Sequence, residues 1–219
     1  VAGLPANAKI SNLSWSPNDT KILFTNTAAN GVELWVIDVA SAQAKKLTEA
    51  NLNANLGAPF SWFGDNETIL VKLLPSNRKP LLDSKKDLPA GPIISNASGA
   101  KSQNRTYPDM LKNKNDEINF ENIITSELSK ITLSGNKTLF KSADMFAGQS
   151  LSPDGNYIMI TTIQKPFSYI VPLNRFPMKS VVYDKSGREV KIVNETPLTE
   201  IMPKGFMAVQ KGKRSLMWR

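Results

Sequence analysis

The sequence predicts an all-β fold made of successive four-stranded antiparallel sheets, and three observations lead to this prediction. A short segment recurs along the chain: a polar strand that ends in Trp or Leu, a tight turn, and a strongly apolar strand. Copies begin at Ser14, Ser61 and Ser150, and a partial copy begins at Ser215. Their turns contain Pro, Asn, Asp or Gly, which suit tight hairpins. Repeats of this kind are typical of β-propellers, whose blades have four strands each.

The first unit can be followed strand by strand as a blade over residues 10–48. Strands are expected near 10–16, 21–27, 32–39 and 43–48. The third of these alternates at first and is then almost wholly apolar, which suits a strand buried between adjacent blades. The Trp or Leu before each turn is expected to fill the wedge between neighbouring blades with a large flat side chain.

The second unit is expected to form a blade over residues 58–143, interrupted by an insertion at 75–124. The first part of this insertion is rich in charge and proline and has little periodicity, which indicates a long surface excursion. Residues 107–124 are expected to be helical, with Pro108 in the first turn. The second blade therefore carries a long, partly helical insertion.

The third unit covers residues 147–196, and residues 206–219 are expected to begin a further blade. The whole chain, 1–219, is thus predicted to be a single partial β-propeller domain. It has about three four-stranded antiparallel blades plus the start of a fourth. Because two outer blade faces then lack neighbours, self-association through these open faces is also expected.

The chain contains no histidine and no cysteine. Without cysteine, disulfides and zinc–thiolate sites are excluded. Without histidine, a Ser-His-Asp triad lacks the imidazole that takes up the serine proton near neutral pH. We therefore expect no enzymatic activity of the chain by itself, no catalytic residue, no metal and no cofactor. A Ser-Lys dyad is not excluded by the composition. It would need a desolvated lysine, and no position in the sequence marks one.

One segment approximates a catalytic motif. Residues 148–152 read Gly-Gln-Ser-Leu-Ser, which is G-x-S-x-G without the final glycine. A nucleophile elbow needs a turn from a strand into a helix. A hairpin turn is expected to follow Ser150 instead, which favours a structural role.

The charge pattern also limits the choice of partners. Lysine and arginine outnumber aspartate and glutamate by 27 to 19, a net charge of +8. The basic residues are scattered, and no arginine-rich arm or basic helix indicates a nucleic-acid partner. No apolar run approaches the length of a transmembrane helix, so no membrane partner is expected. The absence of cysteine fits a periplasmic or otherwise exported bacterial protein, and we expect that location.

Several segments resemble one family. They are Gly-Val-Glu-Leu-Trp-Val-Ile-Asp-Val at 31–39, Pro-Ala-Gly-Pro at 89–92, Arg-Thr-Tyr-Pro-Asp-Met-Leu at 105–111, and Pro-Phe-Ser-Tyr at 166–169 followed by Val-Pro and Arg-Phe-Pro. With these segments the chain resembles the propeller of the glutamyl-endopeptidase-like branch of the prolyl oligopeptidase (S9) family. The hairpin copies alone are shared with many other propellers, including TolB-like ones.

This resemblance implies a function and partners. In the family, a propeller of about seven blades caps a C-terminal α/β-hydrolase domain that holds the Ser-His-Asp triad. The propeller restricts access to the active site and contributes to substrate binding. The expected function is therefore the non-catalytic, substrate-gating part of an exported, glutamate-directed serine endopeptidase. Its expected partners are the hydrolase domain of the parent protein and peptide substrates. The alternative is a TolB-like propeller that binds a protein or peptide and has no enzymatic role.

The resemblance also suggests three substrate-facing residues. Cleavage after glutamate requires a group that pairs with a carboxylate, and arginine does so in a two-pronged way. Arg105 and Arg175 lie in the family-like segments, and Tyr169 offers a hydroxyl. The alternatives stay open that each arginine pairs with a neighbouring blade and that Tyr169 is a core tyrosine with a satisfied hydroxyl.

Overall fold

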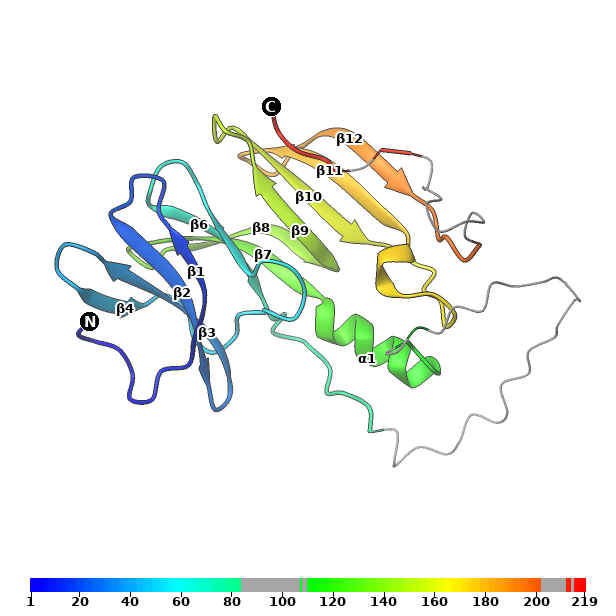
Figure 1. Ribbon diagram of the computed structural model, residues 1–219, viewed down its shortest axis with the longest axis horizontal. Coiled ribbons are helices and arrows are strands. Elements are labelled where there is room, and N and C mark those ends of the chain that lie inside the picture. The colour runs from blue at the N-terminus through cyan, green and yellow to red at the C-terminus, as the bar shows by residue number, and fades with distance from the viewer. Residues whose placement is uncertain (84–106, 108–109, 202–211, 214) are drawn as a thin grey trace, which may run out of the picture.

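The computed structural model describes residues 1–83, 107, 110–201, 212–213 and 215–219. Its strands form three antiparallel sheets of four strands each, which follow one another along the chain (Figure 1). The first sheet contains β1 (Ile10–Trp15), β2 (Lys21–Ala28), β3 (Gly31–Asp38) and β4 (Gln43–Lys46). The second contains β5 (Phe60–Trp62), β6 (Thr68–Leu73), β7 (Ser126–Thr132) and β8 (Lys137–Asp144). The third contains β9 (Phe146–Leu151), β10 (Tyr157–Ile163), β11 (Met178–Asp184) and β12 (Glu189–Thr196).

These sheets confirm the predicted all-β fold. In the first sheet every strand begins and ends within two residues of its predicted position. Consecutive strands are neighbours in each sheet, as in a propeller blade. The three sheets of the described chain do not close into a ring (Figure 1).

In the first and third of the repeated turns, a serine hydroxyl accepts hydrogen bonds from backbone N–H groups. In the first turn the backbone N–H groups of Thr20 and Lys21 donate to Ser16 Oγ (3.2 and 3.0 Å). In the third, the N–H of Tyr157 donates to Ser152 Oγ (2.9 Å). Hydrogen bonds from Ser152 and Asn156 lower the pKa of the Asp154 carboxyl to about 2. These local bonds stabilise the hairpin between the first two strands of the first and third sheets.

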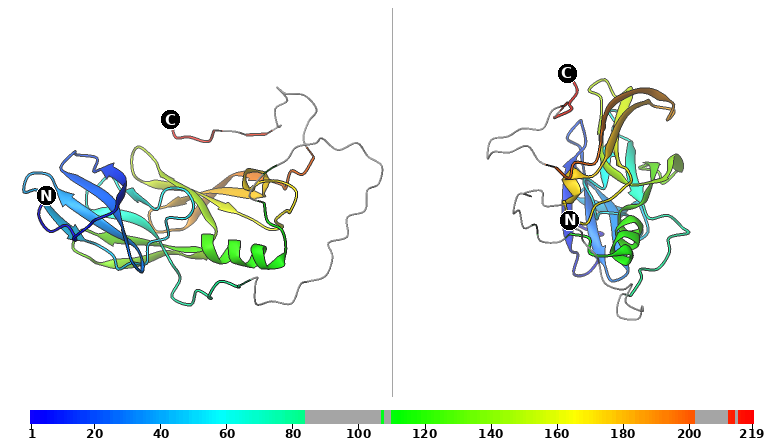
Figure 2. Two further views of the ribbon diagram at one scale, coloured as in Figure 1. Left: turned by 60° about the horizontal axis from the view of Figure 1, so that its bottom comes forward. Right: turned by 90° about the vertical axis from the view of Figure 1, so that its right-hand side faces the viewer.

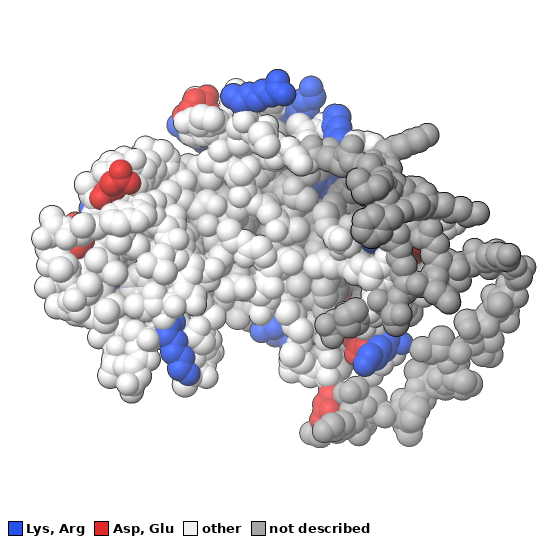
Figure 3. All heavy atoms as spheres, viewed as in Figure 1, with Lys and Arg blue, Asp and Glu red and all other residues white. Residues whose placement is uncertain are grey.

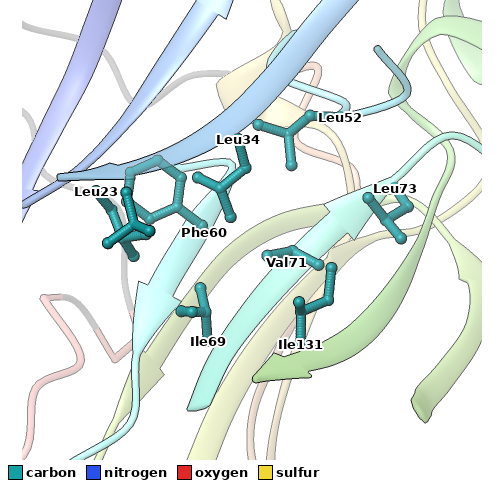
Figure 4. Packing of buried hydrophobic residues seen from close by; sticks show 9 residues of the cluster. Leu23, Leu34, Leu52, Phe60, Ile69, Val71, Leu73 and Ile131 are labelled. Atoms are coloured by element: carbon teal, nitrogen blue, oxygen red, sulfur yellow. The ribbon is translucent and has the colours of Figure 1, made fainter. Parts of the chain in front are cut away.

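The first and second sheets pack face to face around an apolar cluster (Figure 4). The indole Nε1 of Trp62, at the end of β5, donates to the backbone oxygen of Ser14 in β1 (3.3 Å). The predicted wedge-filling role is thus confirmed for Trp62. We call the face of a sheet that packs on the preceding sheet its front face, and the opposite face its back face. The buried members of the cluster are Leu23, Leu34, Val36, Leu52, Phe60, Ile69, Val71, Leu73 and Ile131.

The second and third sheets pack in the same way. Gln149 Nε2 in β9 donates to Ser61 Oγ in β5 (3.3 Å), so the first strands of adjacent sheets approach each other. Between β8 of the second sheet and the β11–β12 hairpin of the third, Lys141 Nζ donates to the backbone oxygen of Gly187 (2.6 Å). The same Nζ lies 3.8 Å from the centre of the Tyr183 ring. The buried members of this second cluster are Phe63, Leu70, Leu128, Phe140, Phe146, Ile158 and Ile160.

The expected start of a further blade at 206–219 falls partly outside the described residues. Its described part, 212–213 and 215–219, contains no strand, and the start of a further blade stays a prediction. A strand needs a paired ladder, and no described strand pairs with these residues. Trp218 nevertheless binds the third sheet, because its Nε1 donates to Ser150 Oγ (3.1 Å). No helix in the described ranges is long and apolar enough to cross a membrane.

Candidate functional site

The insertion of the second sheet contains one described helix, α1 (Lys114–Ile124). Asn113 caps it, because its side chain accepts a hydrogen bond from the backbone N–H of Asp116 (2.9 Å). Asp116 and Glu117 place negative charge in the first turn, where the helix dipole favours it. The helix therefore begins at Lys114, later than predicted. Pro108, expected in the first turn, lies outside the described residues.

An aromatic cluster joins α1 to the segment between β10 and β11. Phe120 meets Phe167 and Phe176 edge to face, with ring centres 5.2 and 5.9 Å apart. Phe167 and Phe176 stack at 5.4 Å. Figure 2 shows α1 along the side of the sheets, close to this segment. The third apolar cluster thus brings the insertion of the second sheet together with the family-like stretch at 166–177.

Tyr169 lies at the exposed edge of this contact. Tyr169 is 39% exposed, and its hydroxyl donates to Glu117 Oε2 of α1 (2.8 Å). Lys114 Nζ lies 2.8 Å from the other carboxylate oxygen of Glu117. The hydrogen bond from Lys114, with that from Tyr169, lowers the pKa of Glu117, and the bond to Glu117 raises the pKa of Tyr169. The hydroxyl is therefore already engaged with the insertion helix.

Replacing Tyr169 by Phe is expected to loosen α1 slightly. The change removes one hydrogen bond to a carboxylate at an exposed site, which is worth about 0.5–1.5 kcal/mol. Amide hydrogen exchange should be faster in α1, with no change in the strands of the first sheet. Unchanged exchange in α1 would show that the bond does not hold the helix.

The structure places one of the two candidate arginines. Arg175 is half-buried at the end of the short 3₁₀ helix η1 (Leu173–Arg175), and its backbone oxygen accepts from the N–H of Thr199 (3.0 Å). No carboxylate among the described residues forms an ion pair with its guanidinium, and no described hydrogen bond joins it to Tyr169. Arg105 lies outside the described residues.

Lys72 is a buried lysine that the sequence analysis missed. It lies in β6 and is 2% exposed, and burial lowers its pKa to about 8. Its Nζ donates to the backbone oxygen of Leu56. The chain therefore does contain a desolvated lysine, but within the described ranges no serine hydroxyl is hydrogen-bonded to it. Its position inside the apolar run at 68–74 is the signal that would have found it.

The segment that approximates a nucleophile motif is part of a strand and a hairpin. Gly148, Gln149 and Ser150 belong to β9, and the turn after it leads directly into β10. Ser150 also accepts the indole N–H of Trp218 through both its backbone oxygen and its hydroxyl. The predicted hairpin is confirmed, and the strand-to-helix geometry of a nucleophile elbow is absent at this place.

Comparison with known proteins gives close sequence matches. The chain is 33% identical, over its whole length, to a probable chloroplastic glutamyl endopeptidase of Oryza sativa subsp. japonica. It is 32% identical, again over its whole length, to a protein of the same description from Arabidopsis thaliana. The chain spans only 24% and 23% of these two relatives. No protein-family profile matches the chain.

The expectation of a periplasmic or exported bacterial protein is wrong. Both curated relatives are described as chloroplastic proteins of plants. That expectation used the absence of cysteine, and cysteine-poor chains occur in reducing and oxidising compartments alike. The composition therefore carried no information on location.

A solved structure supports the fold. A putative TolB from Agrobacterium tumefaciens superposes with a TM-score of 0.51 at 11% identity, covering 89% of this chain and 51% of that one. At this identity the likeness concerns the fold alone. The sequence matches extend over the whole chain and therefore include the segments at 31–39 and 166–177. The chain is thus a propeller-like piece that is similar, over its whole length, to about a quarter of two plant proteins described as probable glutamyl endopeptidases.

Proposed function

We propose that this chain is the non-catalytic, substrate-gating propeller portion of a serine peptidase that cleaves after glutamate. The observation that carries the proposal is the match of the whole chain to part of two probable glutamyl endopeptidases. The partners are the α/β-hydrolase domain of the parent protein and its peptide substrates. A TolB-like binding module has the same fold, but the sequence matches favour the peptidase.

The distribution of charge supports a role in passing peptides. The first strands of the three sheets, β1, β5 and β9, contain no charged residue. The outermost strands, β4, β8 and β12, contain eight. Figure 3 shows a broad face whose centre carries few charged side chains. Because a neutral surface neither attracts nor repels charged peptides strongly, these strands suit the passage of varied sequences.

Within this proposal Arg175 is the residue that recognises the glutamate side chain. Arg175 is half-buried as a residue, its guanidinium has no carboxylate partner in the described part of the chain, and arginine binds a carboxylate strongly through paired hydrogen bonds. Arg105 is proposed as a second such residue. Tyr169 is proposed as a hydroxyl that contacts substrate after it leaves Glu117.

The isolated chain is expected to show no peptidase activity, because it has no histidine for a Ser-His-Asp triad. The test is an assay with a chromogenic peptide that contains glutamate. Turnover that follows the purified chain through two chromatographic steps would refute this part of the proposal.

Binding separates the two functional alternatives. Fluorescence polarisation with matched glutamate and glutamine peptides should show a preference for glutamate that Arg175→Ala abolishes and Arg188→Ala keeps. Arg188 is a suitable control because it is paired with Asp184 in an exposed hairpin (3.0 Å). Equal binding of both peptides would favour the TolB-like module.

A further inference from the structure

The loop at 165–169, which lies between β10 and η1, is held by glutamate side chains from two other parts of the chain. Lys165 Nζ lies 2.7 Å from Glu121 Oε2 of α1. Ser168 is buried, and its Oγ donates to an oxygen of Glu200 (2.7 Å), a residue that follows β12. We call residues 165–169 the donor loop, because its side chains donate to carboxylates that arrive from distant segments.

The remaining side-chain donor of the donor loop is Tyr169, and it belongs to a carboxylate site. Its hydroxyl and Lys114 Nζ each lie 2.8 Å from a different oxygen of Glu117. The hydrogen bond from Lys114 is the largest cause of the lowered pKa of Glu117. Burial opposes it, and the bond from Tyr169 and the charge of Lys165 lower the pKa further. The Glu117 side chain is only 17% exposed, so the site holds an ionised carboxylate that is largely shielded from water.

Neither the capping of α1 nor its packing on the sheets depends on Glu117. Asn113 caps the helix, and Asp116 also places negative charge in the first turn. Phe120 packs the helix against two phenylalanine rings of the segment between β10 and β11. Glu117 is therefore an occupant of the carboxylate site, and other residues keep the helix in place.

We propose that the carboxylate site is a subsite for acidic side chains of peptide substrates, and that Glu117 is its internal occupant. The inference rests on the proposed function, since a peptidase that cleaves after glutamate receives peptides with this side chain. A substrate glutamate carries the same carboxylate on the same stem, so it can replace Glu117 at the hydroxyl of Tyr169 and the ammonium group of Lys114. The subsite adds to Arg175, which has no described hydrogen bond to Tyr169.

An internal occupant weakens the binding of an external one. The apparent dissociation constant equals the intrinsic constant divided by the fraction of molecules in which the site is free. Because Glu117 is tethered beside the two donors, its effective concentration there is on the order of millimolar or higher. A single substrate glutamate then competes poorly, whereas a peptide with several glutamates has more chances to displace Glu117. The internal carboxylate thus makes the propeller favour glutamate-rich peptides.

Fluorescence polarisation of the full chain with a glutamate-rich peptide and its glutamine counterpart tests the inference. Glu117→Ala vacates the subsite, whereas Glu117→Gln removes the charge and keeps the stem. Glu117→Ala should lower the dissociation constant of the glutamate peptide roughly threefold or more, because the free fraction of the subsite rises. Glu117→Gln should shift it in the same direction but less. Binding of the glutamine peptide should not change in either variant.

Tyr169→Phe gives a readout that a purely structural role of Glu117 would not move. In the Glu117→Ala chain this substitution should raise the dissociation constant of the glutamate peptide roughly threefold, because the peptide then uses the hydroxyl. In the parent chain, where Glu117 fills the subsite, the rise should be clearly smaller. An equal effect of Tyr169→Phe in both chains would overturn the inference.

Glu49→Ala is the matched control. Glu49 Oε2 lies 3.0 Å from Lys46 Nζ, and the two residues have the same i,i+3 spacing as Lys114 and Glu117. No tyrosine hydroxyl of the described chain is bonded to Glu49. The control removes the same charge, so it reports any general gain from a more positive chain, and we expect its dissociation constants to equal those of the parent. Equal tightening by Glu49→Ala and Glu117→Ala would contradict a subsite.

Unchanged binding in both Glu117 variants would also overturn the inference. If Arg175→Ala then still abolished the glutamate preference of the parent chain, the proposed function would stand without the subsite. A chain with no glutamate preference in any variant would contradict both proposals. Hydrogen exchange in α1 should stay slow in both Glu117 variants, and loss of this protection in both would show that Glu117 holds the helix and is not a replaceable occupant.

Discussion

The free energy of unfolding is expected to rise by about 3 kcal/mol between pH 8 and pH 10.5 through the titration of Lys72 alone. Burial lowers the pKa of this lysine to about 8 in the folded chain, from 10.5 in the unfolded chain. Between these pH values the unfolded state holds the proton and the folded state does not. The free-energy cost of burying the charged form of Lys72 is therefore fully present below pH 8 and is lost as the pH rises to 10.5.

Other groups titrate in the same range, so the effect must be isolated by substitution. Burial also lowers the pKa of Lys130 and of Lys141, so their titration likewise raises the free energy of unfolding as the pH rises. The raised pKa of Tyr183, due mainly to burial, acts in the opposite direction above pH 10. The difference between variant and parent chain removes these common contributions.

Lys72→Met keeps the shape of the stem and removes the charge. Urea unfolding at several pH values from 7 to 10.5 should show that this variant lacks the additional rise in stability. Lys137→Met, at an exposed position on β8, is the control and should keep the rise. The same pH dependence in Lys72→Met and the parent chain would show that Lys72 is hydrated in solution.

Phe176→Ala is expected to destabilise the chain by about 3–5 kcal/mol, the usual range for a buried phenylalanine. Phe176 is 4% exposed and contacts the rings of both Phe120 and Phe167. Its removal leaves a cavity at the junction of α1 with the third sheet. The loss should appear as a lower urea midpoint and as faster hydrogen exchange in α1.

Two control variants define where this effect originates. Phe176→Leu keeps most of the apolar volume and should cost clearly less than Phe176→Ala. Leu139→Ala, on exposed β8, should change stability by no more than about 0.5 kcal/mol. A loss of less than about 1 kcal/mol in Phe176→Ala would mean that the aromatic cluster does not hold the insertion to the sheets.

The amino-acid sequence by itself determined the repeated unit of this protein. The Ser-Pro-Asn-Asp and Ser-Pro-Asp-Gly turns are stabilised by their own side chains, as at Ser16 and Ser152, so their positions are legible without distant contacts. The segments between these turns are rich in apolar residues that favour β-strands, and the structure forms strands at these positions. The absence of histidine, which excludes a Ser-His-Asp triad in this chain, is likewise a property of sequence alone.

The tertiary structure decided which side chains meet and which are left free. Tyr169 reaches Glu117 over 52 positions of the chain, and Trp62 reaches Ser14 over 48, distances at which no local pattern operates. Burial of Lys72 follows from the packing of β6 in the middle sheet, and the same charged residue on an outer strand would be hydrated. Trp15 is exposed because its sheet has no described neighbour in front. Local bonds set the elements, whereas burial and exposure depend on which sheets pack together.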